Sequence, residues 1–231
     1  MASFLVRSIP NTLTCCNLIS GAIATKIAFE GHLELALTFI IIGAVFDFFD
    51  GFSARLLHVS SPIGKELDSL ADVTSFGMAP SAIVFTLLAS NCSDGLLMKL
   101  VPYAAFLIAA FSALRLAKFN LDERQTTSFI GLPTPANALF WGAFAIGCKE
   151  FHMTENLVIG CIILILFSCW LLISEIPMFA LKFKNFKFKD NALRYGFILT
   201  SIALIAAFRA IGITLAIVWY VLLSVFTQRK K

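Results

Sequence analysis

Charged residues are scarce in this chain. They make up only 14% of its 231 residues, whereas hydrophobic residues make up 59%, and the mean hydropathy is +0.88. This composition excludes an ordinary soluble protein, in which roughly a quarter of the residues are charged. It predicts an all-α protein that crosses the membrane several times. We expect residues 1–231 to form a single membrane-embedded domain with no separate soluble domain.

The usual signals of disulfide bonds and thiolate metal sites are also missing. The six cysteines include no Cys-x-x-Cys spacing, and none of the three histidines has a partner at a ligand spacing. We therefore interpret the cysteines as small helix-packing residues and the histidines as loop residues. The net charge of +4 reflects basic residues in the loops and does not indicate a nucleic-acid partner.

Long apolar runs fill most of the chain. Because about 20 apolar residues cross a bilayer as a helix, we predict eight spans, near residues 11–29, 33–55, 66–90, 97–119, 134–149, 155–175, 192–208 and 210–227. Only the short stretch 208–212 separates the last two, which form either a tight helical hairpin or one long helix; we favour the hairpin. The chain would then consist of a helical core over about 8–178 and a C-terminal hairpin over about 190–228.

The distribution of Lys and Arg predicts how the chain lies in the membrane. The first apolar run is expected to be a retained helix rather than a cleaved signal peptide, because polar residues interrupt it. Eight spans place both termini on one side. Of the 18 Lys and Arg residues, the ones near the opposite side are Lys26, Lys99, Lys149 and Arg209. The positive-inside rule therefore predicts cytoplasmic N and C termini in the cell (inner) membrane.

Four aspartates interrupt the second and third spans. A lone carboxylate inside an apolar membrane helix costs roughly 2.5 to 3.5 kcal/mol. Asp47 and Asp50 are three residues apart, and Asp68 and Asp72 are four apart. Each pair therefore lies on one face of its helix. Two antiparallel helices joined by the 56–63 turn can bring these two faces together, toward the cytoplasmic ends of the spans.

Carboxylates at such close range would repel one another unless cations lie between them. Hard oxygen ligands select hard cations such as Mg²⁺ or Mn²⁺. Four acids can hold two such ions roughly 3.5 to 4 Å apart, an arrangement that holds a phosphoryl group during in-line attack. We therefore predict a site for two divalent cations.

The residues beside the acids are small. Gly51, Ala54 and Gly64 each lie about one helical turn from an aspartate, so the adjacent helix surface leaves room for a flat or bulky ligand. Small residues also serve close helix packing in membranes, but their combination with the acids favours a ligand site. Arg55 follows Ala54 and carries a permanently charged guanidinium that suits a phosphate.

Two other classes of membrane protein also place acids at this depth. A cation transporter would not need Gly, Ala and Arg at these spacings, and the chain shows no inverted repeat of the acid pair. A prenyltransferase typically has two acidic motifs on distant helices, whereas both pairs here lie within residues 47–72. Both readings are disfavoured.

The acids and their neighbours resemble the signature of the CDP-alcohol phosphotransferase family. The matching pattern is Asp47-x-x-Asp50-Gly51-x-x-Ala54-Arg55, eight residues, and Gly64-x-x-x-Asp68-x-x-x-Asp72. The resemblance implies six core helices that form the catalytic part, two divalent cations on the four aspartates, and transfer of a substituted phosphate from a CDP-linked donor to an alcohol, with release of CMP. It also implies that Asp72 is the catalytic base and that the small residues line the cytidine pocket.

Other segments resemble the members of this family that use CDP-diacylglycerol as donor and L-serine as acceptor. The resemblance runs from IPNTLTCCNLISG near the N terminus to FIGLPTPA at 129–136 and covers most of residues 8–140. It implies that Asn11 and Thr14 contact the donor nucleotide, although capping of the first helix would also explain them. It further suggests a homodimer among membrane lipids.

Arg115, Lys118 and Asn120 are the candidates for binding serine. They lie in a cytoplasmic segment that the expected topology places near the acids, and a guanidinium pairs well with a carboxylate. Anchoring of the helix end is the alternative role. By resemblance, the GLPTP sequence at 131–135 would form a rigid loop that borders the serine pocket. Related acceptors, glycerol 3-phosphate or inositol phosphate, stay open but would require a larger basic cluster.

Overall fold

The protein is mainly helical in the part that the structure describes. The computed structural model describes residues 4–59, 61–91, 95, 98–122, 129–149, 154–179 and 188–228. The helices are α1 (Phe4–Phe29), α2 (Leu33–Leu56), α3 (Pro62–Asp72), η1 (Val73–Met78), α4 (Ala79–Ala89), η2 (Val101–Ala105), α5 (Phe106–Leu121), α6 (Thr134–Cys148), α7 (Glu155–Ile173) and α8 (Phe188–Gln228). Two short strands, β1 (Phe129–Ile130) and β2 (Pro177–Met178), pair antiparallel. The predicted all-α membrane fold is confirmed.

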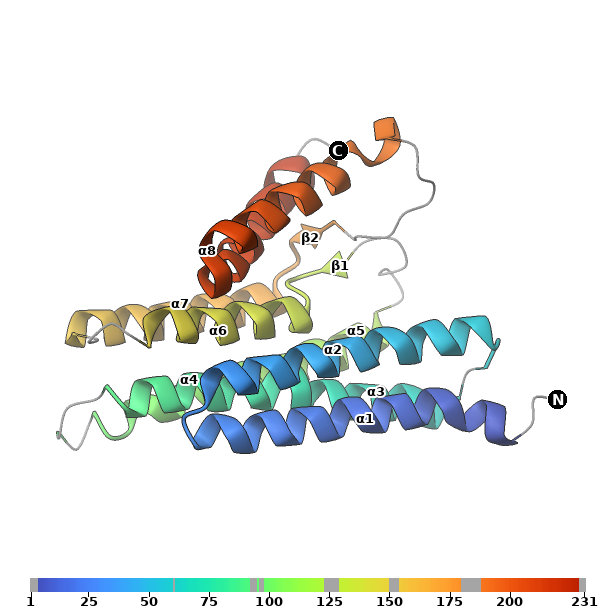
Figure 1. Cartoon of the computed structure of the whole chain (residues 1–231), viewed down its shortest axis with the longest axis horizontal. Coiled ribbons are helices and arrows are strands. Elements are labelled where there is room, and N and C mark those ends of the chain that lie inside the picture. The colour runs from blue at the N-terminus through green and yellow to red at the C-terminus, as the bar shows by residue number, and fades with distance from the viewer. Residues whose placement is uncertain are drawn as a thin grey trace.

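The helices are arranged in layers. Figure 1 shows α1 to α5 together in one layer, with α3 and α4 end to end, then α6 and α7 along this layer, and α8 on the far side of α6 and α7. The centre is filled by large apolar side chains with almost no exposed surface, among them Ile40, Phe76, Ile83 and Trp141. Many outward-facing positions on the helices carry exposed Leu, Ile and Phe, as expected where lipid is the solvent.

The third membrane segment is built from three consecutive pieces, α3, η1 and α4. Ser61 starts it as N-cap, because its Oγ accepts a hydrogen bond from the Gly64 N–H over 3.0 Å, and Pro62 occupies the first helical position. The π-helical turn η1 begins directly after Asp72. Such turns are rare in membrane and soluble helices alike and often occur at functional sites.

Small residues allow α1 to lie close to α2 and η1. A Cβ on Gly43 of α2 would lie 2.9 Å from Asn17 Oδ1, and a Cβ on Gly21 of α1 would overlap the backbone of Ser75. The Ser75 hydroxyl donates a hydrogen bond to the Asn17 carbonyl over 2.8 Å. This close packing brings the polar residues of α1 next to the acidic faces of α2 and α3.

The C-terminal segment is a helical hairpin, as predicted. The backbone of α8 reverses at Arg209 (φ 51°, ψ −123°). Gly212 packs against the backbone of Leu204, and the rings of Phe197 and Tyr220 lie 5.7 Å apart. Residues so far apart in sequence could not touch in one straight helix, because each residue adds about 1.5 Å. Figure 1 shows the two limbs side by side.

Six described segments are long and apolar enough to cross a membrane, which supports an integral membrane protein. The last of them, Asn191–Thr227, contains both limbs of the hairpin. With the two limbs counted separately and with α6, which has only 15 residues, the described residues contain a helix at each of the eight predicted spans, but α6 is not among the six segments. Helix α6 is shorter than the roughly 20 residues that a full crossing needs.

Candidate active site

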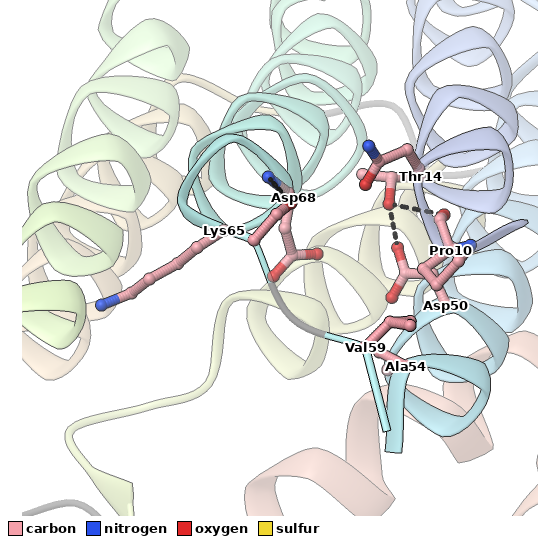
Figure 2. A pocket seen from close by; sticks show the side chains of 11 residues that line it. Pro10, Thr14, Asp50, Ala54, Val59, Lys65 and Asp68 are labelled. Carbon is pink, nitrogen blue, oxygen red and sulfur yellow. Dashed lines mark hydrogen bonds between the residues drawn. The ribbon is translucent and has the colours of Figure 1, made fainter. Parts of the chain in front are cut away.

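Three of the four predicted acids form one cluster between α2 and α3. One carboxylate oxygen from each of Asp47, Asp50 and Asp68 lies within 4.8 Å of the others. Asp50 is only 6% exposed, and Oδ1 of Asp68 is buried without a hydrogen-bond partner in the described part of the chain. Figure 2 shows the carboxylates of Asp50 and Asp68 facing the same space from their two helices. Such a donor set suits a hard divalent cation.

Asp72 interacts with this cluster but is not one of the three acids that form it, and its side chain is oriented by a residue of α1. It is 8% exposed and interacts electrostatically with Asp47 and Asp68. Its Oδ1 accepts a hydrogen bond from Nδ2 of Asn17 over 3.2 Å, and Asn17 is fully buried. Asn17 was not predicted to belong to the site. The sequence did contain one indication of this role, because Asn17 is a polar residue within the first apolar span.

Thr14 orients one of the acids. Its hydroxyl donates to Oδ2 of Asp50 over 2.7 Å and also lies 3.0 Å from the Pro10 carbonyl oxygen. Figure 2 shows both interactions. Thr14 was predicted to contact the donor nucleotide; in the structure it supports Asp50 and also borders the pocket described next. It therefore joins α1 to the acidic cluster.

A pocket of about 310 Å³ opens beside Asp50 and Asp68. A Cβ on Gly64 would lie 3.0 Å from both Asn11 Oδ1 and Ser61 Oγ, so this pocket depends on the absence of a side chain there. The lining residues are Pro10, Asn11, Thr14, Asp50, Gly51, Ala54, Val59, Ser61, Gly64, Lys65 and Asp68. Five of the six predicted donor-binding residues, Asn11, Thr14, Gly51, Ala54 and Gly64, are thus brought together.

Arg55 and Lys65 occupy the edge of this region. Arg55 does not line the pocket, but its Nη1 lies 3.4 Å from the position of a Cβ on Gly51. Lys65 was not predicted, although it is a cation next to Gly64. Its side chain points away from the pocket in Figure 2, and its Nζ donates to the Asn120 carbonyl over 2.9 Å.

A second polar pocket, of about 320 Å³, lies at the end of α5. The buried Arg115 is 7% exposed, and its guanidinium carbon lies 5.3 Å from the centroid of the Phe119 ring. Its Nε has no hydrogen-bond partner among the described residues, and the guanidinium interacts electrostatically with Asp72. The lining residues are Arg115, Lys118, Leu121, Asp122, Ile130, Leu172, Ile173, Ser174 and Glu175.

Asn120 is not brought into this second pocket. Its Nδ2 donates to Ser69 Oγ over 2.7 Å, and its carbonyl accepts from Lys65. These contacts fasten the end of α5 to α3. Of the three candidate serine-binding residues, Arg115 and Lys118 therefore share a pocket, and Asn120 holds neighbouring helices together.

The segment 131–135 was predicted to be a rigid loop beside the serine pocket, but α6 already begins at Thr134, and the second pocket is lined by the preceding Ile130 rather than by these five residues. The Gly131 N–H donates to the Ile176 carbonyl and the Leu132 N–H donates to the Leu171 carbonyl, both over 2.9 Å. Gly131 has φ +74°, and a Cβ there would lie 2.6 Å from the Leu172 carbonyl oxygen. Only glycine fits this position without strain. The loop and the segment after α7 thus form one connected wall.

Fold and site together define a membrane-embedded helical protein in which a cluster of carboxylates that could hold a metal ion lies beside a pocket of about 310 Å³. A family model described as CDP-alcohol phosphatidyltransferase matches residues 7–181. The chain belongs to this family. The family assignment agrees with the sequence signature and disfavours the transporter and prenyltransferase alternatives.

Similar proteins from several organisms are each named CDP-diacylglycerol--serine O-phosphatidyltransferase. The Bacillus subtilis protein is 35% identical over 131 residues, which cover 55% of this chain and 69% of that protein. The Helicobacter pylori J99 protein is 33% identical over 162 residues, covering 68% and 66%. The Methanocaldococcus jannaschii protein is 32% identical over 154 residues, covering 67% and 68%. The chain thus aligns with about two thirds of the length of these relatives.

Proposed function

We propose that this protein transfers the phosphatidyl group of CDP-diacylglycerol to the hydroxyl of L-serine, which gives phosphatidylserine and CMP. The observation that carries the proposal is the cluster of Asp47, Asp50 and Asp68 beside a pocket lined by small residues. The names of the similar proteins support CDP-diacylglycerol as donor and serine as acceptor.

Two divalent cations, Mg²⁺ or Mn²⁺, are proposed as cofactors, with Asp47, Asp50, Asp68 and Asp72 as their ligands. The residues fit such ions, because all the donors are carboxylate oxygens and the buried Oδ1 of Asp68 has no partner among the described residues. When bound, the ions would neutralise the charge of the donor pyrophosphate and of the departing CMP.

The pocket beside the acids is proposed to hold the cytidine end of the donor. Gly51, Ala54 and Gly64 leave space for the nucleotide against the helix backbone, and Asn11 offers an amide for hydrogen bonds at its edge. Arg55, folded over Gly51, would contact a phosphate. The diacylglycerol tails would stay in the bilayer, so that the donor enters sideways.

The chemical step requires a base for the serine hydroxyl, which is barely ionised at neutral pH. The hydroxyl oxygen forms a bond to the phosphorus that carries the diacylglycerol group. The bond from this phosphorus to the oxygen that joins it to CMP breaks, and its electron pair leaves with CMP. Asp72 accepts the hydroxyl proton, and Asn17 fixes the orientation of this carboxylate through the hydrogen bond to Oδ1.

The site is proposed to face the cytoplasm, with both termini on that side of the cell membrane. The positive-inside distribution of Lys and Arg supports this orientation. The homodimer suggested by the family resemblance stays a prediction, and the mass of the purified protein in detergent would test it.

The function is tested with purified protein, CDP-diacylglycerol and Mn²⁺, to which L-serine, glycerol 3-phosphate or inositol phosphate is added separately. We expect CMP release and phosphatidylserine formation in equal amounts with L-serine, and no turnover with the two phosphorylated acceptors. Turnover with a phosphorylated acceptor instead of serine would overturn the assignment of the acceptor and leave the family assignment intact.

A further inference from the structure

The pocket at the end of α5 carries both signs of charge. Arg115 and Lys118 contribute two cations, and Asp122 and Glu175 contribute two carboxylates. A pocket that selects a phosphate monoester would be expected to present mainly cations, because each carboxylate repels a dianion. The balanced charges fit a small zwitterion better.

The charged groups come from two different walls. Arg115, Lys118 and Asp122 belong to α5 and the residue that follows it, whereas Glu175 follows α7. Glu175 therefore reaches the pocket from a different segment than Arg115 and is separated from it by more than 50 residues of sequence. Asp122, in contrast, is four residues after Lys118 at the same helix end.

The wall that carries Glu175 is well fixed. On one side of Glu175, the Ser174 hydroxyl donates to the Leu171 carbonyl over 2.9 Å, and on the other side the Ile176 carbonyl accepts from Gly131. Two residues after Glu175, Pro177 pairs with Ile130 in the β1–β2 strand pair, which extends this wall. A charged side chain on such a support can discriminate between ligands, because little ordering is required when the ligand binds.

Arg115 connects this pocket to the acids of the first site. Arg115 lines the pocket, is almost fully buried, and has an Nε without a partner among the described residues. It also interacts electrostatically with Asp72. A ligand whose carboxylate binds Arg115 would therefore have its other end near the proposed base.

We propose that Glu175 binds the ammonium group of the acceptor and so makes the enzyme specific for an amino acid, while Arg115 binds the acceptor carboxylate. This inference rests on the proposed function, since it takes serine as the acceptor. In serine, the ammonium, carboxylate and hydroxyl groups all lie within a few bonds of one carbon atom. A pocket with a cation on one wall and an acid on the other can hold the first two and direct the third toward Asp72.

The test compares L-serine with 3-hydroxypropanoate, which has the same hydroxyl and carboxylate but no ammonium group. CMP release from CDP-diacylglycerol is measured in the full-length protein and in Glu175→Gln, with Asp122→Asn as the matched control. For Glu175→Gln we expect the KM for L-serine to rise about tenfold or more, with kcat within about threefold. The ratio of kcat/KM for serine over 3-hydroxypropanoate should fall by about the same factor.

Turnover of 3-hydroxypropanoate also serves as a control for correct folding. Because this acceptor has no ammonium group, Glu175→Gln should use it as fast as the wild-type protein does. A conservative Glu175→Asp variant should recover part of the preference for serine. An unchanged ratio in Glu175→Gln, an equal loss with both acceptors, or loss of the preference in Asp122→Asn instead would each overturn the proposal. Absence of CMP release with serine in the wild-type protein would contradict the proposed function itself.

Discussion

Asn17 on α1 donates a hydrogen bond to Asp72 on α3, with Nδ2 and Oδ1 separated by 3.2 Å. Both side chains are buried, so the contact is shielded from water. This hydrogen bond fixes the direction of the Asp72 carboxylate, which is both the proposed base and a proposed metal ligand. It thus links the first helix of the chain to the chemical step.

Removal of this contact should slow catalysis more than it weakens substrate binding. For Asn17→Ala we expect kcat to fall about tenfold or more, because a base that is not oriented loses much of its contribution. The KM for CDP-diacylglycerol should change less than about threefold. Ser20→Ala on the same helix is the control, since Ser20 bonds only to the Cys16 carbonyl among the described contacts. A rise in KM without a loss of kcat would contradict the role assigned to Asn17.

Loss of one clustered carboxylate should abolish activity. In Asp68→Asn, a neutral amide replaces an acid whose oxygen lies within 4.8 Å of those of Asp47 and Asp50. We expect CMP release to fall more than about 100-fold and the affinity for Mn²⁺ to fall with it. Glu66→Gln, an exposed acid on the same helix, should keep nearly wild-type activity. Equal activities of the two variants would exclude a catalytic role for Asp68.

A side chain at Gly64 should obstruct the donor. The added Cβ would lie 3.0 Å from both Asn11 Oδ1 and Ser61 Oγ, at the lining of the pocket. We therefore expect Gly64→Val to raise the KM for CDP-diacylglycerol by about tenfold or more. Gly160→Val on α7 provides the control, because nothing lies within 4 Å of a Cβ there. Similar donor KM values in the two variants would remove Gly64 from the pocket.

The C-terminal hairpin should stabilise the wall of the second pocket. Tyr220 donates its hydroxyl to the Phe179 carbonyl over 2.9 Å, and the two rings lie 4.8 Å apart. Tyr220→Phe leaves a buried carbonyl unpaired, and we expect a loss of about 1 to 3 kcal/mol in stability. Thermal unfolding in detergent measures it, with the exposed Tyr103→Phe as control. An unchanged Tm in Tyr220→Phe would argue against this bracing contact.

The features that follow from helical periodicity could be predicted from the sequence. Spacings of three and four residues place Asp47 with Asp50 and Asp68 with Asp72 on common helix faces, and the short turn between the helices leaves few ways to combine them. The hairpin could be predicted because only the short stretch 208–212 separates two apolar runs. The exact point of reversal, Arg209, could not be predicted, because a positive φ is unusual for residues other than glycine.

The features that depend on packing between distant segments were missed. Asn17 reaches Asp72 only because glycines let α1 approach α2 and η1 closely, and a sequence does not give the rotation of one helix against another. Asn120 was expected to bind serine because it lies two residues after Lys118, but its side chain donates a hydrogen bond to Ser69 on α3. Glu175 enters the second pocket because of the β1–β2 pairing, which joins residues far apart in sequence.

The proposed phosphatidyl transfer depends on divalent cations held by Asp47, Asp50 and Asp68. Anomalous diffraction from crystals of the protein soaked in Mn²⁺ would locate these ions. We expect anomalous peaks between α2 and α3, in contact with these three carboxylates. Crystals that bind Mn²⁺ elsewhere, or that show no peak at this cluster, would contradict the proposal.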